Sequence, residues 1–484
     1  MKLNNPELLR SQCLINGEWC DALSGKREAV TNPATGAELA SIPLVSEEET
    51  QQAIAAAQRA QNDWKQLTAK QRSALLLAWA DKVLAAQEDL AQLMTAEQGK
   101  SLAEARGEVA YAASFITWFA EEAKRVDGAV LQAPQASQRL VVVKQPIGVC
   151  AAITPWNFPA AMITRKVAPA LAAGCAIIVK PAEQTPLTAL ALAKLAQDAG
   201  IPAGVLQVVT GEAAQVGKVL CDSPVVRKLS FTGSTEVGRI LMAQCAPSIK
   251  KLSLELGGNA PVIVFDDANL DAAVAGIMAS KFRNSGQTCV CANRIYVQDG
   301  IYERLAEKLV AAVEQLNVGD GSQEGTTQGP LIDSDAVAKV QSHIDDALIK
   351  GAQIATGGQP HALGGTFFQP TVVTGVTQKM RFAKEETFGP VAPLFRFHDE
   401  AEAIAMANDT EFGLAAYLFT QNAARQWRVP EALEYGMVGI NTGLISNEVA
   451  PFGGVKQSGL GREGSRYGIE EYLELKYLCI DVSR

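Results

Sequence analysis

The sequence has few histidines, three in 484 residues, and none of its cysteines form a Cys-x-x-Cys pair. Structural zinc sites are usually built from four His or Cys ligands with such spacing, so we expect no structural metal. The nine cysteines are scattered from position 13 to position 479 and their number is odd, which is not typical of a disulfide framework. A reducing cytoplasm is therefore the expected compartment.

Long apolar runs and basic blocks are also missing. The longest apolar stretch, residues 167–179, is interrupted by Pro169 and Gly174 and is too short to cross a bilayer. The first six residues lack the apolar core of a signal peptide. Asp and Glu outnumber Lys and Arg by 52 to 43, so we expect neither a nucleic-acid partner nor an anionic-membrane surface.

The composition that remains is that of an ordinary globular protein. Hydrophobic residues make up 48% and charged residues 20%, which excludes intrinsic disorder and collagen-like repeats. At about 100–200 residues per domain, the length predicts two to four structural units. These values suit a metabolic enzyme and leave its chemistry open.

The distribution of apolar residues predicts an α/β fold. Residues 47–123 are rich in Ala, Leu, Glu and Gln, with apolar positions three and four residues apart, which predicts helices. From residue 139 onward, short β-branched runs alternate with helical stretches, as in βαβ units around a parallel sheet. The expected strands are 139–143, 149–153, 176–180, 205–209, 228–232, 261–265, 294–297 and 437–441. The helical stretches between them are 160–173, 186–199 and 213–222, and the alternation favours two α/β units divided near residue 256.

The segment from Ser285 to Asn293 contains glycine, small polar residues and Cys289. Such a loop can hold a thiol close to backbone amides, where a lowered pKa or a proton acceptor would make it a nucleophile. Taken alone, Cys289 could equally be a small buried residue.

Glu255 stands where a strand-like run gives way to a glycine-rich turn, Leu254 to Pro261. Sites in α/β sheets lie at such strand ends, and a partly buried carboxylate there can serve as a general base. A solvated loop glutamate is the alternative.

Two further loops follow predicted strands. In the segment from Ser230 to Gly238, Ser234 can cap a helix whose N-terminus could receive a phosphate, although a plain tight turn explains Gly233 equally well. In the segment from Thr154 to Pro159, two prolines stiffen a loop that carries Asn157, whose amide suits an oxyanion-hole donor.

Taken together, these motifs resemble the aldehyde dehydrogenase superfamily. The resemblance extends from about residue 12 to Tyr477 and includes, in the family's order, Phe-Thr-Gly-Ser, Glu-Leu-Gly-Gly-Asn, Gly-Gln-x-Cys, Glu-Glu-x-Phe-Gly-Pro and Pro-Phe-Gly-Gly. It implies a Rossmann-type cofactor-binding domain, an α/β catalytic domain and a small β bridging element. The implied ranges are 1–127 with 147–255, then 256–469, and 128–146 with 470–484.

The same resemblance implies roles for the catalytic residues. Cys289 would add to the aldehyde carbon, and Asn157 together with the Cys289 N–H would hold the oxyanion. A hydride would pass to a nicotinamide, and Glu255 would activate the water that hydrolyses the resulting thioester.

Cofactor contacts carry over in the same way. Lys180 and Glu183 would contact the adenosine ribose, Gly233 and Ser234 the pyrophosphate, and Glu386 and Phe388 the nicotinamide half. The further cofactor-binding positions implied are Thr154, Pro155, Trp156 and Leu256.

Glu183 leads to an expectation about cofactor choice. A carboxylate at this position can accept hydrogen bonds from two ribose hydroxyls and would repel a 2′-phosphate, so we expect NAD to be preferred over NADP.

Local sequences around Arg165, Arg283 and Ser446 resemble the succinate-semialdehyde dehydrogenase branch of the superfamily. There, two arginines and a serine hold the distal carboxylate, which guanidinium groups can bind through paired charge-assisted bonds. Glutarate semialdehyde is the nearest alternative, and a broader aldehyde range or a cofactor-independent thiol hydrolase are others. A non-catalytic structural role is a further alternative.

The resemblance raises two more expectations. Cys291 could form a reversible disulfide with Cys289, although i,i+2 bridges need a particular loop geometry and Cys291 could be merely buried. Residues 128–146 and 470–482 match an element that pairs with another subunit, so we expect a homodimer or homotetramer.

Overall fold

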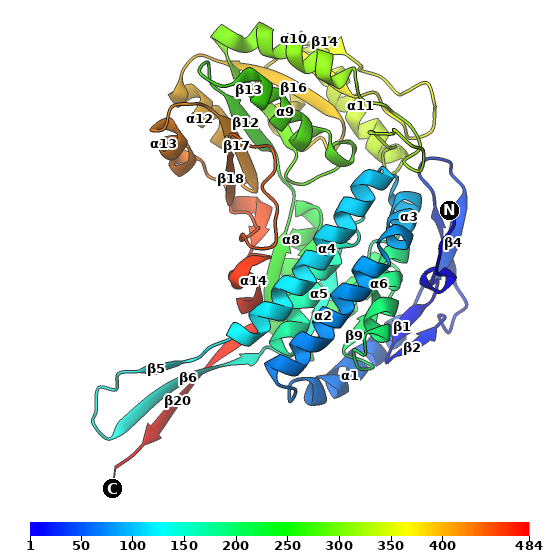
Figure 1. Ribbon diagram of the computed structural model, residues 1–484, viewed down its shortest axis with the longest axis vertical. Coiled ribbons are helices and arrows are strands. Elements are labelled where there is room, and N and C mark those ends of the chain that lie inside the picture. The colour runs from blue at the N-terminus through cyan, green and yellow to red at the C-terminus, as the bar shows by residue number, and fades with distance from the viewer. Residues whose placement is uncertain (484) are drawn as a thin grey trace.

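The computed structural model describes residues 1–483. An eight-stranded sheet lies at the centre of its lower lobe, as oriented in Figure 1. The strand order is β19-β11-β10-β7-β8-β9-β1-β2, with β7 to β11 parallel and the pairs at both edges antiparallel. Its strands are β1 (Cys13–Ile15), β2 (Glu18–Cys20), β7 (Val149–Ile153), β8 (Ala176–Lys180), β9 (Leu206–Val208), β10 (Val226–Thr232), β11 (Lys251–Glu255) and β19 (Gly459–Leu460).

Chain order reverses direction in the middle of this sheet. From β7 the chain moves outward through β8 and β9 on one side, and then returns to β10 and β11 on the other. In open α/β sheets, ligands bind outside the carboxyl ends of the strands at such a reversal. The residues that follow Ile153, Lys180, Thr232 and Glu255 all lie along this edge.

Helices cover both faces of the eight-stranded sheet. The long helical region divides into four because the sequence contains stop and start signals: Ser46, Thr68 and Ser101 each form a capping box, and Gly99 ends a helix with φ 96°. Its helices are α1 (Glu47–Trp64), α2 (Ala69–Ala85), α3 (Gln87–Gln98) and α4 (Leu102–Glu122). The crossover helices are α5 (Ala161–Ala173), α6 (Pro186–Asp198), α7 (Ala213–Asp222) and α8 (Thr235–Cys245).

Two buried tryptophans join these helices. The Trp79 indole N–H on α2 donates to the carbonyl of Leu192 on α6, and that of Trp64 on α1 donates to the carbonyl of Leu171 on α5, both at 3.1 Å. Each indole therefore buries a large apolar surface with its polar group satisfied.

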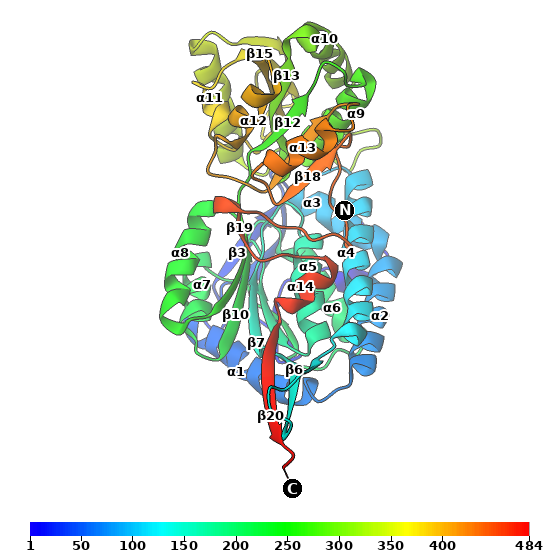
Figure 2. The same ribbon diagram turned by 90° about the vertical axis from the view of Figure 1, so that its left-hand side faces the viewer.

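A second sheet, of seven strands, forms the upper lobe in Figures 1 and 2. Its order is β14-β15-β16-β13-β12-β17-β18. The strands are β12 (Ala260–Val264), β13 (Ala292–Gln298), β14 (Gln353–Thr356), β15 (Thr371–Val376), β16 (Val391–Phe397), β17 (Ala415–Phe419) and β18 (Met437–Ile440). The helices around it are α9 (Leu270–Lys281), α10 (Tyr302–Val313), α11 (Ser334–Ile349), α12 (Glu400–Asn408) and α13 (Arg425–Ala432).

After β18 the chain returns to the lower lobe. There β19 pairs antiparallel with β11, placing Leu460 opposite Leu254 and Gly459 opposite Glu255. Helix α14 (Ser465–Glu470) follows. The lower sheet thus contains two residues of chain from beyond the upper lobe.

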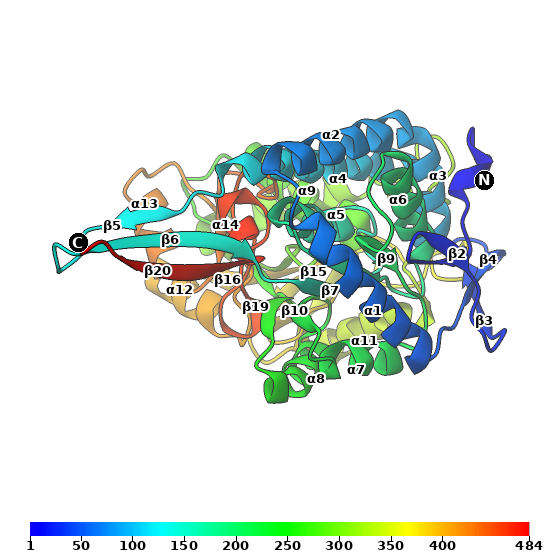
Figure 3. The same cartoon turned by 90° about the horizontal axis from the view of Figure 1, so that it is seen from below.

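A three-stranded arm projects from the lower lobe (Figures 1 and 3). Its strands are β5 (Ala129–Leu131), β6 (Gln138–Pro146) and β20 (Leu473–Asp481), with β6 in the middle. All residues of β20 after Leu473 are exposed. A separate hairpin, β3 (Arg27–Thr31) with β4 (Glu38–Pro43), lies near the N-terminus.

The predicted α/β class is confirmed. The expected strands 149–153 and 176–180 match β7 and β8 to the residue, and the other six overlap observed strands. The sequence-based prediction did not include short or edge strands such as β1 to β5, nor did it include β14 to β17. Within residues 1–483, no helix is both long enough and apolar enough to cross a membrane.

Candidate active site

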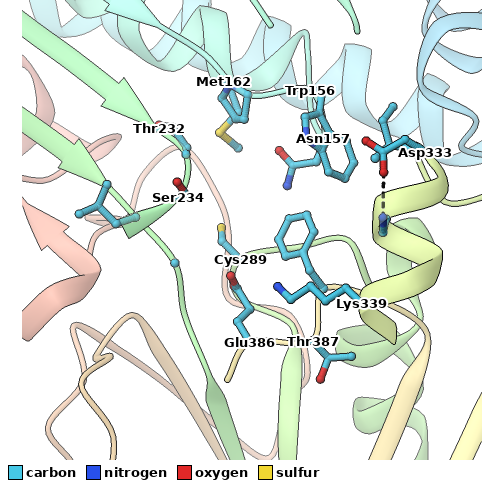
Figure 4. A pocket seen from close by; sticks show the side chains of 17 residues that line it. Trp156, Asn157, Met162, Thr232, Ser234, Cys289, Asp333, Lys339, Glu386 and Thr387 are labelled. Carbon is cyan, nitrogen blue, oxygen red and sulfur yellow. Dashed lines mark hydrogen bonds between the residues drawn. The ribbon is translucent and has the colours of Figure 1, made fainter. Parts of the chain in front are cut away.

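A cavity of about 290 Å³ lies where the two lobes face each other, between loops at the carboxyl edge of the lower sheet and loops that lead into β12, β13 and β16 (Figure 4). Predicted site residues from distant parts of the chain meet here. Those that line it are Pro155, Trp156, Asn157, Gly233, Ser234, Leu256, Cys289, Glu386 and Phe388. Also lining it are Met162, Thr232, Gly257, Ile332, Asp333, Ala336, Lys339 and Thr387.

The loop that carries Cys289 has an unusual backbone. Asn284, Ser285 and Gly286 have φ angles of 52°, 55° and 74°, three consecutive left-handed residues, which cost energy unless the surroundings hold them. They are held: the Asn284 N–H donates to Glu104 at 2.7 Å and the Ser285 hydroxyl to the Gly329 carbonyl at 2.9 Å. The loop therefore presents the Cys289 thiol to the cavity in a fixed position.

Burial raises the pKa of the Cys289 thiol to about 12. The Arg165 guanidinium works against this rise, while the carboxylates of Glu386 and Glu255 add to it. The thiol is thus protonated near neutral pH, and a proton acceptor is needed before it can act as a nucleophile.

Asn157 borders the same cavity and is 5% exposed. Its amide nitrogen donates one hydrogen to the carbonyl of Gln287 at 3.0 Å, and the amide carries a second donor hydrogen. The backbone carbonyl of Asn157 accepts from the Lys100 ammonium at 2.8 Å and from the Asn284 side-chain amide at 3.0 Å. The Asn157 loop and the Cys289 loop are therefore tied together by hydrogen bonds.

Lys100 and Glu108 are supporting residues that the sequence did not reveal. Their side chains form an ion pair that is almost completely buried. Glu108 also accepts from the N–H groups of Ala160 and Ala161, at 2.9 and 3.2 Å, where α5 begins. Both residues lie in the stretch 47–123 that the sequence predicts to be helical, where charged positions are normally solvated, so no local signal distinguished them.

Glu255 ends β11 and is 3% exposed, but it does not line the cavity. Both carboxylate oxygens are buried and lack hydrogen bonds from residues 1–483. Burial raises its pKa well above the ordinary value, and Glu463 raises it further, while Arg165 and Lys166 act in the opposite direction. A carboxyl group with a raised pKa suits proton transfer near neutrality.

Aromatic and acidic side chains also line the cavity. Trp156 and Phe388 pack edge to face, with ring centroids 5.5 Å apart and planes at 86°. Glu386 accepts from the Gly258 N–H at 3.0 Å, and burial raises its pKa to about 7. The Thr232 hydroxyl borders the cavity and has no hydrogen-bond partner within the described chain, so it is free to bond to a group in the cavity.

Helix α11 supplies side chains that sequence reasoning missed. Asp333 caps this helix by accepting from the Ala336 N–H at 2.8 Å, and Lys339 extends into the cavity in Figure 4. The sequence of α11 is typical of an ordinary amphipathic helix, so nothing in it indicates that its side chains would line a cavity.

Three of the predicted cofactor residues lie outside the cavity lining. Lys180 and Glu183, after β8, form an ion pair with an N–O distance of 2.7 Å, and the Thr154 N–H donates to the Lys180 carbonyl at 3.1 Å. Burial raises the pKa of Glu183, but the neighbouring Lys180 charge outweighs this and the net pKa is lowered. Glu183 is thus a charged carboxylate whose charge is compensated.

The predicted substrate residues do not line the first cavity. Arg283 and Ser446 line a second cavity, of about 240 Å³, with Phe158 under the guanidinium at 4.9 Å. Arg165 is fully buried beside it, 2.9 Å from Glu463 and over the ring of Phe452 at 3.9 Å.

Cys291 does not line either cavity. Its buried sulfur accepts from the Lys281 ammonium at 3.3 Å and lies 3.4 Å from the Lys281 carbonyl. A disulfide between Cys289 and Cys291 stays a prediction.

Comparison with known proteins agrees with this arrangement. Residues 19–478 match the profile of the Aldehyde dehydrogenase family. A protein of Escherichia coli named succinate-semialdehyde dehydrogenase (NADP(+)) GabD is 65% identical over 99% of this chain and 100% of its own. A glutarate-semialdehyde dehydrogenase of Pseudomonas putida is 64% identical over the full length of both chains. The crystal structure of succinate-semialdehyde dehydrogenase from Burkholderia pseudomallei superimposes with a TM-score of 0.99 at 63% identity, covering both chains completely.

The expected preference for NAD over NADP is wrong. The E. coli relative, at 65% identity, is named as an NADP(+) enzyme, which contradicts an inference based on Glu183 alone. The ion pair supplies the physical reason: Lys180 compensates the Glu183 charge, so the repulsion that was expected to exclude a 2′-phosphate is weakened.

Proposed function

The chain belongs to the aldehyde dehydrogenase family, and from that premise we propose that it oxidises succinate semialdehyde to succinate with NADP as cofactor. The observation that carries the choice of substrate is the state of Arg283. Lys100 and Arg165 are paired with Glu108 and Glu463, whereas Arg283 has no ion pair with any carboxylate of residues 1–483. An unpaired guanidinium that lines a cavity beside Ser446 favours an anionic ligand.

The residues around the larger cavity fit a nicotinamide cofactor. Ser234 caps α8, whose N-terminus can face a pyrophosphate, and the unsatisfied Thr232 hydroxyl borders the same space. Glu386 and Phe388 would contact the nicotinamide half, and Lys180 and Glu183 the adenosine half. When bound, the cofactor supplies the hydride acceptor.

The chain's own residues account for the remaining steps. Glu255 takes the proton of the Cys289 thiol and releases it to solvent before the later hydrolysis. The Cys289 sulfur forms a bond to the aldehyde carbon, whose C=O π electrons move to oxygen, and gives a thiohemiacetal oxyanion. The second N–H of Asn157 and the backbone N–H of Cys289 stabilise this charge. Loss of a hydride from that carbon restores the C=O bond and leaves a thioester on Cys289. Glu255 then takes a proton from water, the hydroxide adds to the thioester, and succinate leaves as the thiolate departs.

Glutarate semialdehyde is the second candidate, and the Pseudomonas putida relative favours it. The two acids differ by one methylene, which changes binding in a pocket by only about 1–3 kcal/mol. We therefore expect turnover of both, with a modest preference between them.

The direct test is the absorbance change at 340 nm with NADP and with NAD, using succinate semialdehyde, glutarate semialdehyde and neutral butanal. The proposed function requires kcat/KM for succinate semialdehyde to exceed that for butanal. Equal values for the acid and the neutral aldehyde would argue against an anion-binding pocket.

Replacing Arg283 by Ala tests the same pocket from the protein side. We expect KM for succinate semialdehyde to rise about 30-fold or more, because charge-assisted hydrogen bonds contribute roughly 1.5–3 kcal/mol each. KM for butanal should change little, since it has no carboxylate to lose. An equal loss with both substrates would show that Arg283 acts structurally.

The titration of Glu386 gives a pH prediction. With a pKa of about 7, this carboxyl group is mostly neutral at pH 6 and mostly charged at pH 8. A charged carboxylate accepts hydrogen bonds from ribose hydroxyl groups more strongly than a neutral carboxyl group does. We therefore expect KM for the cofactor to fall several-fold as pH rises across this range. Cofactor KM measured against pH should lose this slope in the Glu386→Gln variant. A slope that persists there would assign the titration to another group.

We further propose that the arm joins copies of this chain into a dimer or tetramer. Both outer strands of the arm, β5 and β20, have an unpaired edge, and Val130, Leu475 and Tyr477 are 78%, 69% and 57% exposed. Exposed apolar edge strands favour pairing with another chain. We also propose that the chain divides into a cofactor-binding part and a catalytic part at the boundaries given above. We propose a cytoplasmic location as well.

A further inference from the structure

Tyr111 on α4 borders the second cavity together with Arg283 and Ser446. Its hydroxyl oxygen is buried and has no hydrogen-bond partner of good geometry within residues 1–483. A buried hydroxyl without a partner destabilises the free protein, so its presence in a cavity indicates a ligand group that satisfies it.

The position of this hydroxyl is fixed by packing. The Tyr111 ring contacts Phe115, one helical turn further along α4, edge to face with centroids 4.9 Å apart and planes at 79°. A tyrosine has only two rotatable side-chain bonds, so a packed ring leaves little freedom for its oxygen.

The charged residues that line this cavity with Tyr111 are Lys100, Arg283, Glu104 and Glu108. Lys100 is paired with Glu108, and Glu104 accepts from the Asn284 N–H, which leaves Arg283 as the charge open to an anionic ligand. Burial raises the pKa of the phenol and the Glu463 carboxylate adds to this rise, whereas Arg165, Arg283 and, least of these, Ser446 lower it. The net pKa is raised, so the hydroxyl keeps its proton and can donate. Arg165 likewise has an Nη2 atom that is buried without a partner.

We propose that Tyr111 is a substrate-binding residue that donates its phenolic hydrogen to the distal carboxylate of the semialdehyde acid. The carboxylate would thereby receive hydrogen bonds from Arg283, Ser446 and Tyr111, which line the same cavity. The proposal rests on the proposed function, since it assigns a further contact to the same substrate.

The test is the Tyr111→Phe variant, which keeps the ring and its contact with Phe115 and removes only the oxygen. We expect KM for succinate semialdehyde to rise about tenfold, the size of one hydrogen bond to a charged group. The value of kcat should stay within about twofold, because the hydroxyl contacts no reacting atom, and KM for butanal should not change.

Tyr467→Phe is the matched control. Tyr467 is half-exposed on α14, and its hydroxyl accepts from Arg466, away from both cavities. We expect its kinetic constants to equal those of the wild type. If Tyr111→Phe left KM for the acid unchanged, or raised KM equally for acid and butanal, the assignment of Tyr111 would be overturned.

The outcome separates this proposal from the proposed function. A wild-type enzyme without any preference for succinate semialdehyde over butanal would reject the function itself, and Tyr111 with it. A wild type that prefers the acid, with an unchanged Tyr111→Phe variant, would reject the role of Tyr111 alone. A melting temperature close to the wild-type value would show that the variant is folded.

Discussion

Replacing Cys289 by Ser is expected to lower kcat by about 10⁴-fold or more. In the proposed mechanism the sulfur is the atom that bonds to the substrate carbon, and a serine hydroxyl in the same place is a far weaker nucleophile because its pKa is higher. The change removes little volume, and Cys289 is a partly buried residue that borders the cavity and packs at the margin of the upper-lobe core, so the fold should be retained.

Turnover of succinate semialdehyde, together with cofactor binding by fluorescence, checks this result. Cofactor binding should survive in the Cys289→Ser variant, which separates loss of chemistry from loss of structure. Cys479→Ser, on the exposed arm strand β20, is the matched control and should turn over normally. Retention of more than about one hundredth of the wild-type kcat would reject Cys289 as the nucleophile.

Replacing Gly286 by Ala should damage both stability and activity. A Cβ atom at this position would lie 2.1 Å from the Gly389 carbonyl oxygen, and the φ of 74° is strained for any L side chain. Neither the Gly286 loop nor the Gly389 backbone can move freely, because they lead to Cys289 and to β16 respectively. We expect the free energy of unfolding to fall by about 3 kcal/mol.

Activity should fall further than stability alone requires. A displacement of the nucleophile by about 1 Å can cost about 100-fold in rate, and the Cys289 loop is the segment that must shift. Gly300→Ala is the control, since a Cβ there meets no atom within 4 Å. Thermal unfolding and kcat measured on both variants check the prediction, and a Gly286→Ala protein with wild-type values would refute it.

The sequence revealed most of the fold because short-range patterns determine most of it. Strands β7 and β8 are continuous β-branched and small apolar runs between helices with clear end signals, so their bounds could be predicted closely. Strands β1 and β19, which lie near or at the two edges of the lower sheet, are only two or three residues long, and they pair with segments about 200 residues away.

The predicted site residues divide in the same way. Cys289 and Asn157 come from short motifs, and the structure brings them to one cavity. By contrast, the contact between Lys100 and the Asn157 carbonyl spans 57 positions, and Lys339 reaches the cavity from a helix without any motif. The error about NAD has a similar origin, because the charge of Glu183 was considered without the lysine that neutralises it.

The return of β19 to the lower sheet affects how the protein can be synthesised. Strand β11, which ends at Glu255, keeps an open hydrogen-bonding edge until residues 459 and 460 have left the ribosome. By then almost the whole chain, including the upper lobe, has been made. The lower lobe therefore cannot finish folding as an independent N-terminal unit, and during translation its exposed edge is a place where chaperones or neighbouring nascent chains can bind.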